Sequence, residues 1–401
     1  MIKLQLRNIY LSRIRPFYTD KNIKVLVGLR RCGKSVLLNQ IINELKESNV
    51  NDDHIIYISY EFIENDDLKD YRKLNKFVID KIIDNKQYYL FLDEIQLVDN
   101  FAHVINSLRA RFNNLSIFIT GSNSKLLPDE LPTELSGRYI GFKINPFSYQ
   151  EYIEYTNLDG YDENVFWQFA KWGGLPNAVD YKDDRQRKEY LNYVFDSIIL
   201  RDVVERLGLK DTNLLNTIIG YLLETVGKKF GAENITNYLK NEKCSVATDT
   251  IYNYIDALCK SLLIRKVNRY DIRGKSVLKT LNKFYLTDLG LAYIKKNNPN
   301  IDDAYILENI VFNELITRDY DVYIGKTNKG EIDFYATKYE KKMYIQVCAS
   351  LVSLDTRKRE FAAFKDAEED IPKYVISLDK KDYSQNGIIH KNIIDWLLEK
   401  Y

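Results

Sequence analysis

One segment of eight residues constrains the fold of this chain more than any other. It reads GLRRCGKS and runs from Gly28 to Ser35. An apolar run, Ile23–Val27, precedes it, and a helical pattern, Val36–Lys46, follows it. A glycine-rich loop of the form GxxxxGK[ST] between a strand and a helix is typical of phosphate binding. The segment therefore predicts an α/β fold with a phosphate site, and the alternative is a glycine-rich turn before a core helix.

Each part of this loop has an expected role in binding ATP and Mg²⁺. Gly28 and Gly33 allow backbone N–H groups to approach phosphate oxygens, and the start of the following helix adds partial positive charge. Lys34 is expected to neutralise the β- and γ-phosphates, and Ser35 to offer its hydroxyl to Mg²⁺. The predicted nucleotide contacts are Gly28, Arg30, Arg31, Cys32, Gly33, Lys34, Ser35 and Val36.

A pair of acidic residues supports the same site. The apolar run Tyr88–Leu92 ends in Asp93 and Glu94, so a buried strand should deliver both carboxylates to the carboxyl edge of the sheet, where ligands of α/β sheets bind. We expect Asp93 to hold the Mg²⁺ shell and Glu94 to orient or deprotonate the attacking water. The adjacent acids favour an ATPase of the AAA+ type. The alternative is that they only cap the strand.

Two further positions are candidates for sensing the γ-phosphate and for completing the site. The strand Ser116–Thr120 ends in a polar turn, where Ser122 is the first choice as sensor and Thr120 and Asn123 are the next. Arg138 is a candidate arginine finger, a residue that acts from a neighbouring subunit or domain. This role predicts a homo-oligomer. The alternatives are ordinary capping at the turn and a surface role for the arginine.

The order of predicted elements divides the chain into four parts. Residues 1–145 alternate short apolar strands with amphipathic helices, which indicates a parallel sheet covered by helices. Residues 146–225 read as helices alone and predict a helical lid or connector. Residues 226–295 contain two helices and a β-hairpin, which favours a winged helix, and residues 296–401 predict a smaller α/β domain.

Composition excludes several classes of protein. The chain has 401 residues, with 58 Lys plus Arg against 57 Asp plus Glu, so any attraction to nucleic acid must be local. The four cysteines lie far apart and support neither a disulfide framework nor a zinc site. No long uncharged apolar run occurs, which predicts a cytoplasmic protein without a membrane partner.

One stretch does carry a local excess of positive charge. The segment Lys260–Lys283 holds eight basic residues and one acidic residue. A basic hairpin beside a winged helix is where phosphate contacts with DNA are expected. The alternative is a solvated face on a protein-binding module. The predicted DNA contacts are Lys266, Arg269, Arg273 and Lys275.

The motifs extend to a resemblance over nearly the whole chain. Its segments are GLRRCGKSVLL, FLDEIQLV, FITGSNSKLL, ELSGRYIGFKINPFSYQEY, WGGLPNAV, LRDVVER, FYLTDLGL, ILENIVFNEL, GEIDFYA and YIQVCASL. They resemble a bacterial and archaeal family of AAA+ ATPases with a C-terminal domain of unknown function, DUF4143. The resemblance implies an AAA+ core, a winged helix and a terminal domain that is similar to restriction endonucleases.

Nucleases of the PD-(D/E)xK type place acidic residues and a lysine around Mg²⁺. The corresponding positions here are Glu308, Asp333, Gln346 and, where the lysine is expected, Cys348. Without the lysine the attacking water lacks its cationic partner, so we interpret the domain as an inactive scaffold whose polar positions serve packing or nucleic-acid contact.

The combined hypothesis is a Mg²⁺-dependent ATPase whose nucleotide cycle changes how its C-terminal domains bind DNA. One alternative is an ATP-dependent switch that recruits a protein partner with little turnover. Another, which the missing lysine disfavours, is an ATP-dependent nuclease.

Overall fold

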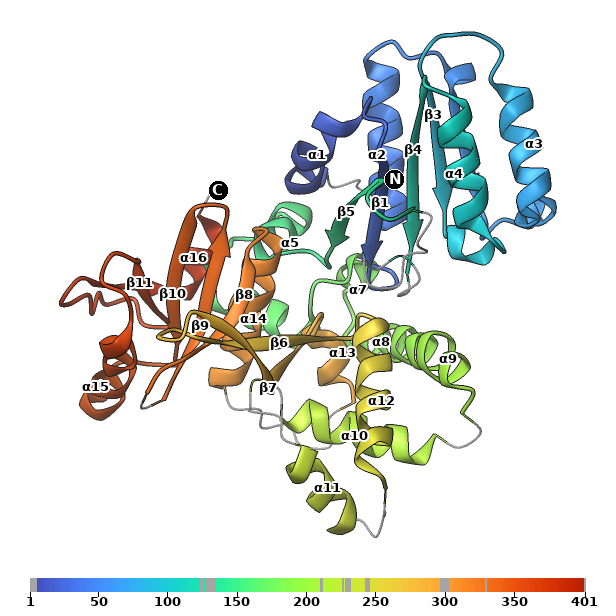
Figure 1. Cartoon of the computed structure of the whole chain (residues 1–401). Coiled ribbons are helices and arrows are strands. Elements are labelled where there is room, and N and C mark those ends of the chain that lie inside the picture. Colours follow the sequence, from blue (N-terminus) through green and yellow to red (C-terminus); the bar gives the residue numbers. More distant parts are fainter. Residues whose placement is uncertain are drawn as a thin grey trace. The chain divides into compact units, whose positions relative to one another are not determined.

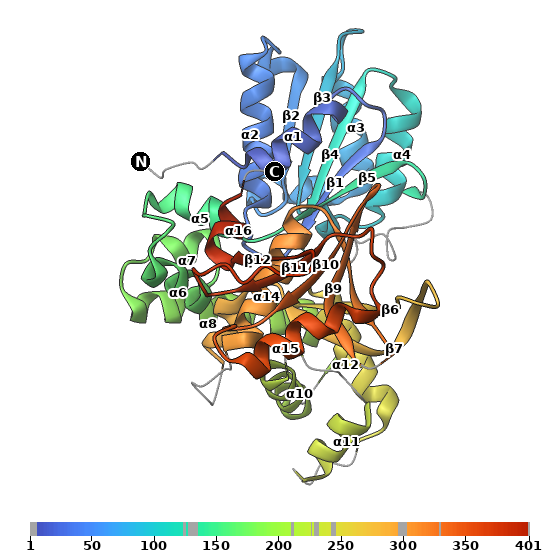
Figure 2. The same cartoon turned by 90° about the vertical axis from the view of Figure 1, so that its left-hand side faces the viewer.

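The chain folds into two compact units, each built around a β-sheet (Figures 1 and 2). The first unit comprises residues 1–145 and 260–262, and the second comprises residues 146–259 and 263–401. The structure, a computed structural model, describes residues 6–122, 126, 135–209, 212–225, 227, 232–241, 246–295, 303–328 and 330–399.

The first unit is an open parallel sheet. Its strands lie in the order β2-β3-β4-β1-β5, and every neighbouring pair is parallel. This confirms the predicted α/β core. Its helices and strands are α1 Asn8–Ile14, β1 Ile23–Gly28, α2 Lys34–Glu47, β2 Ile55–Ser59, α3 Tyr71–Lys81, β3 Tyr88–Asp93, α4 Phe101–Arg111, β4 Leu115–Gly121 and β5 Tyr139–Ile144, with short 3₁₀ turns η1 Arg15–Phe17, η2 Asp52–His54, η3 Ile63–Lys69 and η4 Ile95–Leu97.

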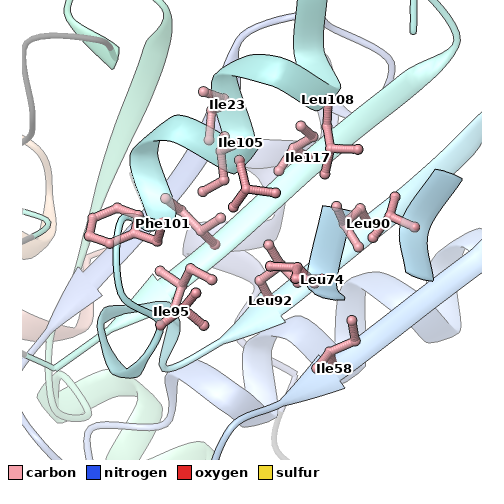
Figure 3. Packing of buried hydrophobic residues seen from close by; sticks show 14 of the residues in the cluster. Ile23, Ile58, Leu74, Leu90, Leu92, Ile95, Phe101, Ile105, Leu108 and Ile117 are labelled. Carbon is pink, nitrogen blue, oxygen red and sulfur yellow. The ribbon is translucent and has the colours of Figure 1, made fainter. Parts of the chain in front are cut away.

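The sheet is buried on both faces, which explains why its central strands read as continuous apolar runs. All residues of β1, β3 and β4 are buried. In Figure 1, α3 and α4 cover one face while α1 and α2 lie on the other. Figure 3 shows side chains of β1, β3 and β4 packed against α3 and α4, among them Ile23, Leu74, Leu90, Leu92, Phe101, Ile105, Leu108 and Ile117. This packing fixes β1, β3 and β4 side by side. Because the strands are parallel, their carboxyl ends lie at the same edge of the sheet.

The second unit contains a seven-stranded mixed sheet in the order β12-β11-β10-β9-β8-β6-β7. Helix α14 packs against β7, β8, β9 and β10. The elements of this unit are α5 Tyr149–Thr156, α6 Glu163–Trp172, α7 Pro176–Asp180, α8 Asp184–Ile198, the π-helical turn η7 Ile199–Val204, α9 Glu205–Leu207, α10 Asn213–Glu224, α11 Ala232–Asn241, α12 Thr248–Lys260, β6 Ile264–Asp271, β7 Ser276–Leu286, α13 Leu289–Tyr293, α14 Asp303–Thr317, β8 Asp321–Lys326, β9 Glu331–Lys338, β10 Lys341–Val347, α15 Leu354–Ala362, η8 Ala363–Asp366, β11 Lys373–Ser377, β12 Ile388–Asn392 and α16 Ile393–Leu398.

The β6–β7 hairpin differs from the expected free wing. Strands β6 and β7 pair antiparallel as predicted, but β6 also pairs in parallel with β8, with Arg269 opposite Ile324. The hairpin is therefore one end of the seven-stranded sheet. An edge strand offers unpaired N–H and C=O groups, and here β8 pairs with the last three residues of β6, Arg269 to Asp271. The sheet thus continues across the expected boundary between residues 295 and 296, and the four domain limits stay predictions.

Helices dominate residues 146–225, as their sequence pattern indicates. The first of them, α5, starts with a capping box in which Ser148 and Glu151 satisfy each other's backbone N–H groups. No helix in the described part of the chain has the length and apolarity needed to traverse a bilayer.

Candidate nucleotide-binding site

Two positions around the loop between β1 and α2, Gly33 and Gly28, favour glycine over any other residue. Gly33 has a φ of 100°, in the left-handed region, and directly precedes α2. At Gly28, a Cβ atom would lie 2.2 Å from the carbonyl oxygen of Ile144 and 2.8 Å from Sγ of Cys32. The loop is therefore drawn tightly around the end of β1. Its last N–H groups belong to the first turn of α2, which favours an anion.

Lys34 lies at the centre of this loop. Its side chain is 4% exposed, and its Nζ donates to the carbonyl oxygens of Gly28 at 3.1 Å and Leu29 at 3.2 Å. The same Nζ is 3.9 Å from Oε1 of Glu94, which comes from the end of a different strand. The Lys34 ammonium thus interacts with two carbonyl oxygens of the loop and with the carboxylate of Glu94. The arrangement brings together the predicted phosphate-binding lysine and the predicted water-activating carboxylate.

The remaining predicted contacts follow from the geometry of the loop. Ser35 and Arg30 are half-buried, while Arg31 and Val36 are exposed and Cys32 is buried. Arg31 also adopts a positive φ of 68°. The Ser35 hydroxyl and the exposed side chain of Arg31 can therefore meet a ligand at the loop, whereas Cys32 could contribute only its backbone.

Asp93 and Glu94 are buried at the carboxyl end of β3. Oγ1 of Thr120 donates to Oδ1 of Asp93, and the hydroxyl of Tyr57 donates to Oδ2 at 3.3 Å. The backbone N–H of Glu94 in turn donates to Oγ1 of Thr120 at 3.0 Å. Parallel pairing of Leu92 with Ile119 places the ends of β3 and β4 side by side and so creates these contacts. Thr120 thus orients the acid pair.

The carboxylate of Glu94 is held by two polar side chains. Oγ of Ser122 donates to Oε2 of Glu94 at 2.9 Å, and Nε2 of Gln96 donates to the same oxygen. Gln96 is 8% exposed, and its Oε1 has no hydrogen-bond partner within the described residues. Sequence reasoning placed Ser122 near the γ-phosphate but missed Gln96. A glutamine inside the apolar segment after the acid pair was the available signal.

Two further candidates from the sequence are Asn123 and Arg138. Asn123 lies outside the described residues. Arg138 is exposed, donates to Oδ1 of Asn106, and accepts through its carbonyl from the N–H of Ile23 at 2.9 Å. Ile23 starts β1, and the phosphate loop follows the end of that strand about 17 Å away. Arg138 therefore lies at the edge of the sheet opposite to the phosphate loop.

The donor groups of the site suit Mg²⁺. Within the described ranges no group of three or more His, Cys, Asp or Glu side chains is arranged to hold a metal ion. Magnesium in phosphoryl-transfer sites is usually held by one or two protein oxygens together with water and substrate phosphates. The Asp93 carboxylate and the Ser35 hydroxyl would supply such oxygens, and the bound ion would neutralise charge on the β- and γ-phosphates.

Comparison with known proteins agrees with this geometry. Residues 20–153, which include the loop, the acid pair and Ser122, match the family described as AAA domain. This part of the chain is an AAA domain. An AAA domain binds nucleotide through its P-loop, so we refer to the chain as an AAA+ protein. Residues 163–300 of this AAA+ protein match a different domain of unknown function, DUF8612, so the comparison does not support the expected DUF4143 domain.

Relatives of this AAA+ protein extend over nearly its full length. An uncharacterized protein from Haemophilus influenzae is 35% identical over 400 residues, which is 98% of both chains. The uncharacterized protein MJ1544 from Methanocaldococcus jannaschii is 30% identical over 385 residues, or 91% of this chain and 83% of that one. Neither relative has an assigned activity.

Similarities to solved structures are weak. PCH-2 of C. elegans aligns with a TM-score of 0.27 and 18% identity, over 47% of this chain and 53% of that chain. Saccharomyces cerevisiae RIF2 aligns with a TM-score of 0.29 and 13% identity, over 49% of this chain and 82% of that chain. Scores this low carry no information about function.

The second unit of the AAA+ protein brings together most of the nuclease-like positions. The N–H of Asp333 donates to Oε1 of Gln346 at 3.2 Å, and Nε2 of Gln346 donates to Oε2 of Glu360 at 2.8 Å. Cys348 instead packs in the hydrophobic core around Tyr335 and Phe361. Cys348 directly follows the end of β10 and is buried, so the position expected to hold the catalytic lysine is a core position.

A lysine does reach the carboxylates, but from a distant strand that sequence reasoning did not consider. Nζ of Lys283 on β7 donates to Oε1 of Glu308 at 2.9 Å and lies 3.9 Å from Oδ1 of Asp333. Burial opposes the charge of Lys283, yet Glu308 and Asp333 hold its pKa above the ordinary value. Burial and then Glu308 raise the pKa of Asp333 to about 8. The cluster thus joins β7, α14 and β9 through an internal ion pair.

The basic hairpin is largely neutralised by acidic residues that are distant in sequence. Nε of Arg269 lies 3.2 Å from Oε1 of Glu331, and both side chains are nearly buried. Arg273 pairs with Asp366 at 3.7 Å, and Lys275 with Glu368 at 3.5 Å. Lys266 is exposed. The expectation that Arg269 contacts DNA is corrected, because the folded sheet buries its guanidinium against a carboxylate.

Proposed function

We propose that this AAA+ protein hydrolyses ATP with Mg²⁺ at the site formed by Lys34, Ser35, Asp93 and Glu94. The observation that carries this proposal is the 3.9 Å separation between Nζ of Lys34 and Oε1 of Glu94. This distance supports the proposal, because a cation that binds phosphate is needed beside a carboxylate that acts on water. Such a pair at the carboxyl edge of a parallel sheet is suited to phosphoryl transfer, which depends mainly on positioning and charge stabilisation.

Each side chain of the proposed site has its own role in hydrolysis. Lys34 moves from the carbonyl oxygens of Gly28 and Leu29 to the β- and γ-phosphates. Glu94 accepts a proton from a water whose oxygen bonds to the γ-phosphorus, while the bond from that phosphorus to the bridging oxygen breaks and ADP leaves. Ser122 and Gln96, which contact Glu94, set the direction of its carboxylate. General-base action of this kind contributes about a hundredfold or more in rate.

We further propose that Arg138 acts in a neighbouring subunit of a homo-oligomer. Its position beside Ile23, at the other end of β1, keeps it away from the phosphate loop of its own chain. An arginine that stabilises the transferred phosphoryl group must then come from elsewhere. Native mass spectrometry with ATP analogues tests this proposal, because an exclusively monomeric protein with full ATPase activity contradicts it.

The output of the cycle is the least constrained part of the proposal. DNA binding by the second unit stays our first hypothesis, with Lys266, Arg273 and Lys275 as exposed basic residues. The ion pairs of Arg269, Arg273 and Lys275 favour the second candidate, recruitment of a protein partner. ATPase rates with and without single- and double-stranded DNA at several salt concentrations separate them. Each phosphate contact adds about one unit to the log–log salt slope, so a DNA-independent rate and a flat slope favour the protein partner.

Replacement of Glu94 by glutamine tests the hydrolysis itself. Glu94→Gln keeps the hydrogen bonding of the side chain but removes the base, so turnover should fall on the order of a hundredfold while ATP still binds. Asp99→Asn is the matched control, because Asp99 is an exposed acid a few residues later. Equal turnover in both variants would leave only a switch without catalysis by Glu94.

A further inference from the structure

A buried arginine near the N-terminus contacts the phosphate-binding loop. Arg7, which directly precedes α1, is 1% exposed. Its Nη1 donates to the carbonyl oxygen of Cys32 at 2.9 Å and to that of Asn145 at 3.0 Å. A guanidinium is buried at high cost unless its N–H groups are satisfied. Two of its hydrogen bonds go to backbone carbonyls, one in the loop and one after β5.

The contact with Cys32 determines how the loop presents its backbone. The carbonyl of Cys32 and the N–H of Gly33 belong to the same planar peptide and point in opposite directions. When Arg7 holds the carbonyl, the N–H of Gly33 is directed away from Arg7. Gly33 is the last residue before α2, where the run of N–H groups that can bind phosphate begins. Arg7 therefore orients the first of these donors.

The contact with Asn145 is one of several hydrogen bonds around the end of β5. The hydroxyl of Tyr10 accepts from the N–H of Asn145 at 3.1 Å, so the segment around α1 holds both backbone polar groups of this residue. The backbone N–H of Arg7 also donates to Oε1 of Gln40 in α2 at 3.1 Å. Sγ of Cys32 lies 3.4 Å from the carbonyl oxygen of Ile144. Loop, helix α2 and the end of β5 are thus joined through one segment.

Asn145 is the last residue of the first unit before the chain enters the second unit at Pro146. We propose that Arg7 is a positioning residue that shapes the phosphate-binding loop and couples its occupancy to the Asn145–Pro146 junction. The inference rests on ATP binding as proposed above. The same Nη1 atom donates to the carbonyls of both Cys32 and Asn145. A change in the loop on phosphate binding therefore alters the hydrogen bond to Asn145.

The first test measures affinity for a fluorescent ATP analogue in magnesium buffer. Arg7→Ala should weaken binding about tenfold or more, the effect of losing charge-assisted hydrogen bonds to the loop. Arg7→Lys, with one compact ammonium, should be intermediate. Arg15→Ala is the matched control, because Arg15 pairs with Glu44 of α2 at the surface at 2.6 Å and does not touch the loop. Millimolar guanidinium should restore binding to Arg7→Ala, a rescue that a general loss of folding would not show.

The second test measures amide hydrogen exchange at residues 144–148 with and without saturating ATP analogue. Wild-type protein and Arg15→Ala should change exchange there on binding, and Arg7→Ala and Arg7→Lys should lose most of that change even at saturation. If Arg7→Ala does not fold, affinity and hydrogen exchange are both measured on Arg7→Lys. Wild-type affinity and wild-type exchange in the Arg7 variants would overturn this inference and leave the proposed function intact. Absence of binding to the wild-type protein would overturn the proposed function and this inference with it.

Discussion

The hydroxyl of Ser122 donates to Oε2 of Glu94 at 2.9 Å, joining the turn after β4 to the acid that follows β3. Glu94 itself has a left-handed backbone, with φ of 58° and ψ of 44°. A non-glycine residue in this region is uncommon and is retained where surrounding contacts determine it. The direction of the Glu94 carboxylate is therefore imposed by its neighbours, which makes those neighbours relevant to the proposed hydrolysis.

Replacement of Gln96 tests this view. Gln96→Leu removes one of the two donors to Glu94 at nearly constant volume, so the carboxylate should lose its fixed direction. We expect kcat to fall about tenfold with little change in ATP affinity, the pattern for an interaction that matters mainly in the transition state. Gln87→Leu is the control, because the Gln87 side chain donates to the Tyr88 carbonyl at the other end of β3. An increased KM with unchanged kcat would contradict the prediction.

Binding of ATP should stabilise the first unit through Lys34. At a ligand concentration of about 100 times Kd, the expected gain is about 2.7 kcal/mol, seen as a rise in the melting temperature. Lys34→Ala should abolish this rise because it removes the cation that meets the phosphates. Lys21→Ala, at an exposed lysine, should keep it. Thermal scans with Mg²⁺-ATP measure the effect, and an undiminished shift in Lys34→Ala would place the nucleotide elsewhere.

Lys24 should make the stability of the first unit depend on pH. It is fully buried in β1, its Nζ donates to the carbonyl of Asp20 and to Ser116, and burial lowers its pKa from 10.5 to about 7. Between these values the unfolded chain binds the proton and the folded chain does not, so stability rises with pH. The slope is at most about 1.4 kcal/mol per pH unit.

Lys24→Met should remove this dependence. Urea unfolding of the wild type and the variant at pH 7 and pH 9.5 should show the difference in free energy of unfolding shifting in favour of the wild type at the higher pH. Ser116 keeps a partner in the variant, because its hydroxyl also donates to the Tyr18 carbonyl at 2.6 Å. Parallel pH curves for the two proteins would show that Lys24 stays charged when folded.

Lys283 should contribute to the stability of the second unit far more than the surface lysine of the same hairpin. Lys283→Met leaves Glu308 and Asp333 without their cation and should cost about 3 kcal/mol, as for a buried pair that loses one partner. Lys275→Met breaks an exposed pair with Glu368 and should cost about 1 kcal/mol or less. Urea unfolding monitored in the second unit measures both, and equal costs would contradict the buried role.

Local sequence was sufficient for the elements that depend on neighbouring residues. The glycine and lysine spacing from Gly28 to Ser35, the strand that ends at Asp93 and the alternation of strands and helices in residues 1–145 predicted the parallel sheet and the AAA+ core, which the structure and the family match confirm. These features follow from backbone dihedral preferences and hydrophobic periodicity, which act over a few residues. They determined which side chains reach the carboxyl edge of the sheet.

Tertiary structure decided which distant residues meet. Arg7 reaches Cys32, Lys283 reaches Glu308, and the hairpin arginines find acidic partners only because strands far apart in the chain pair or pack together. A charge count along the chain cannot foresee this, since a buried charge takes whichever partner the packing supplies. The sequence by itself thus determined the phosphate loop and its acid pair. The folded chain decided what holds them in place and how much of the basic segment stays free.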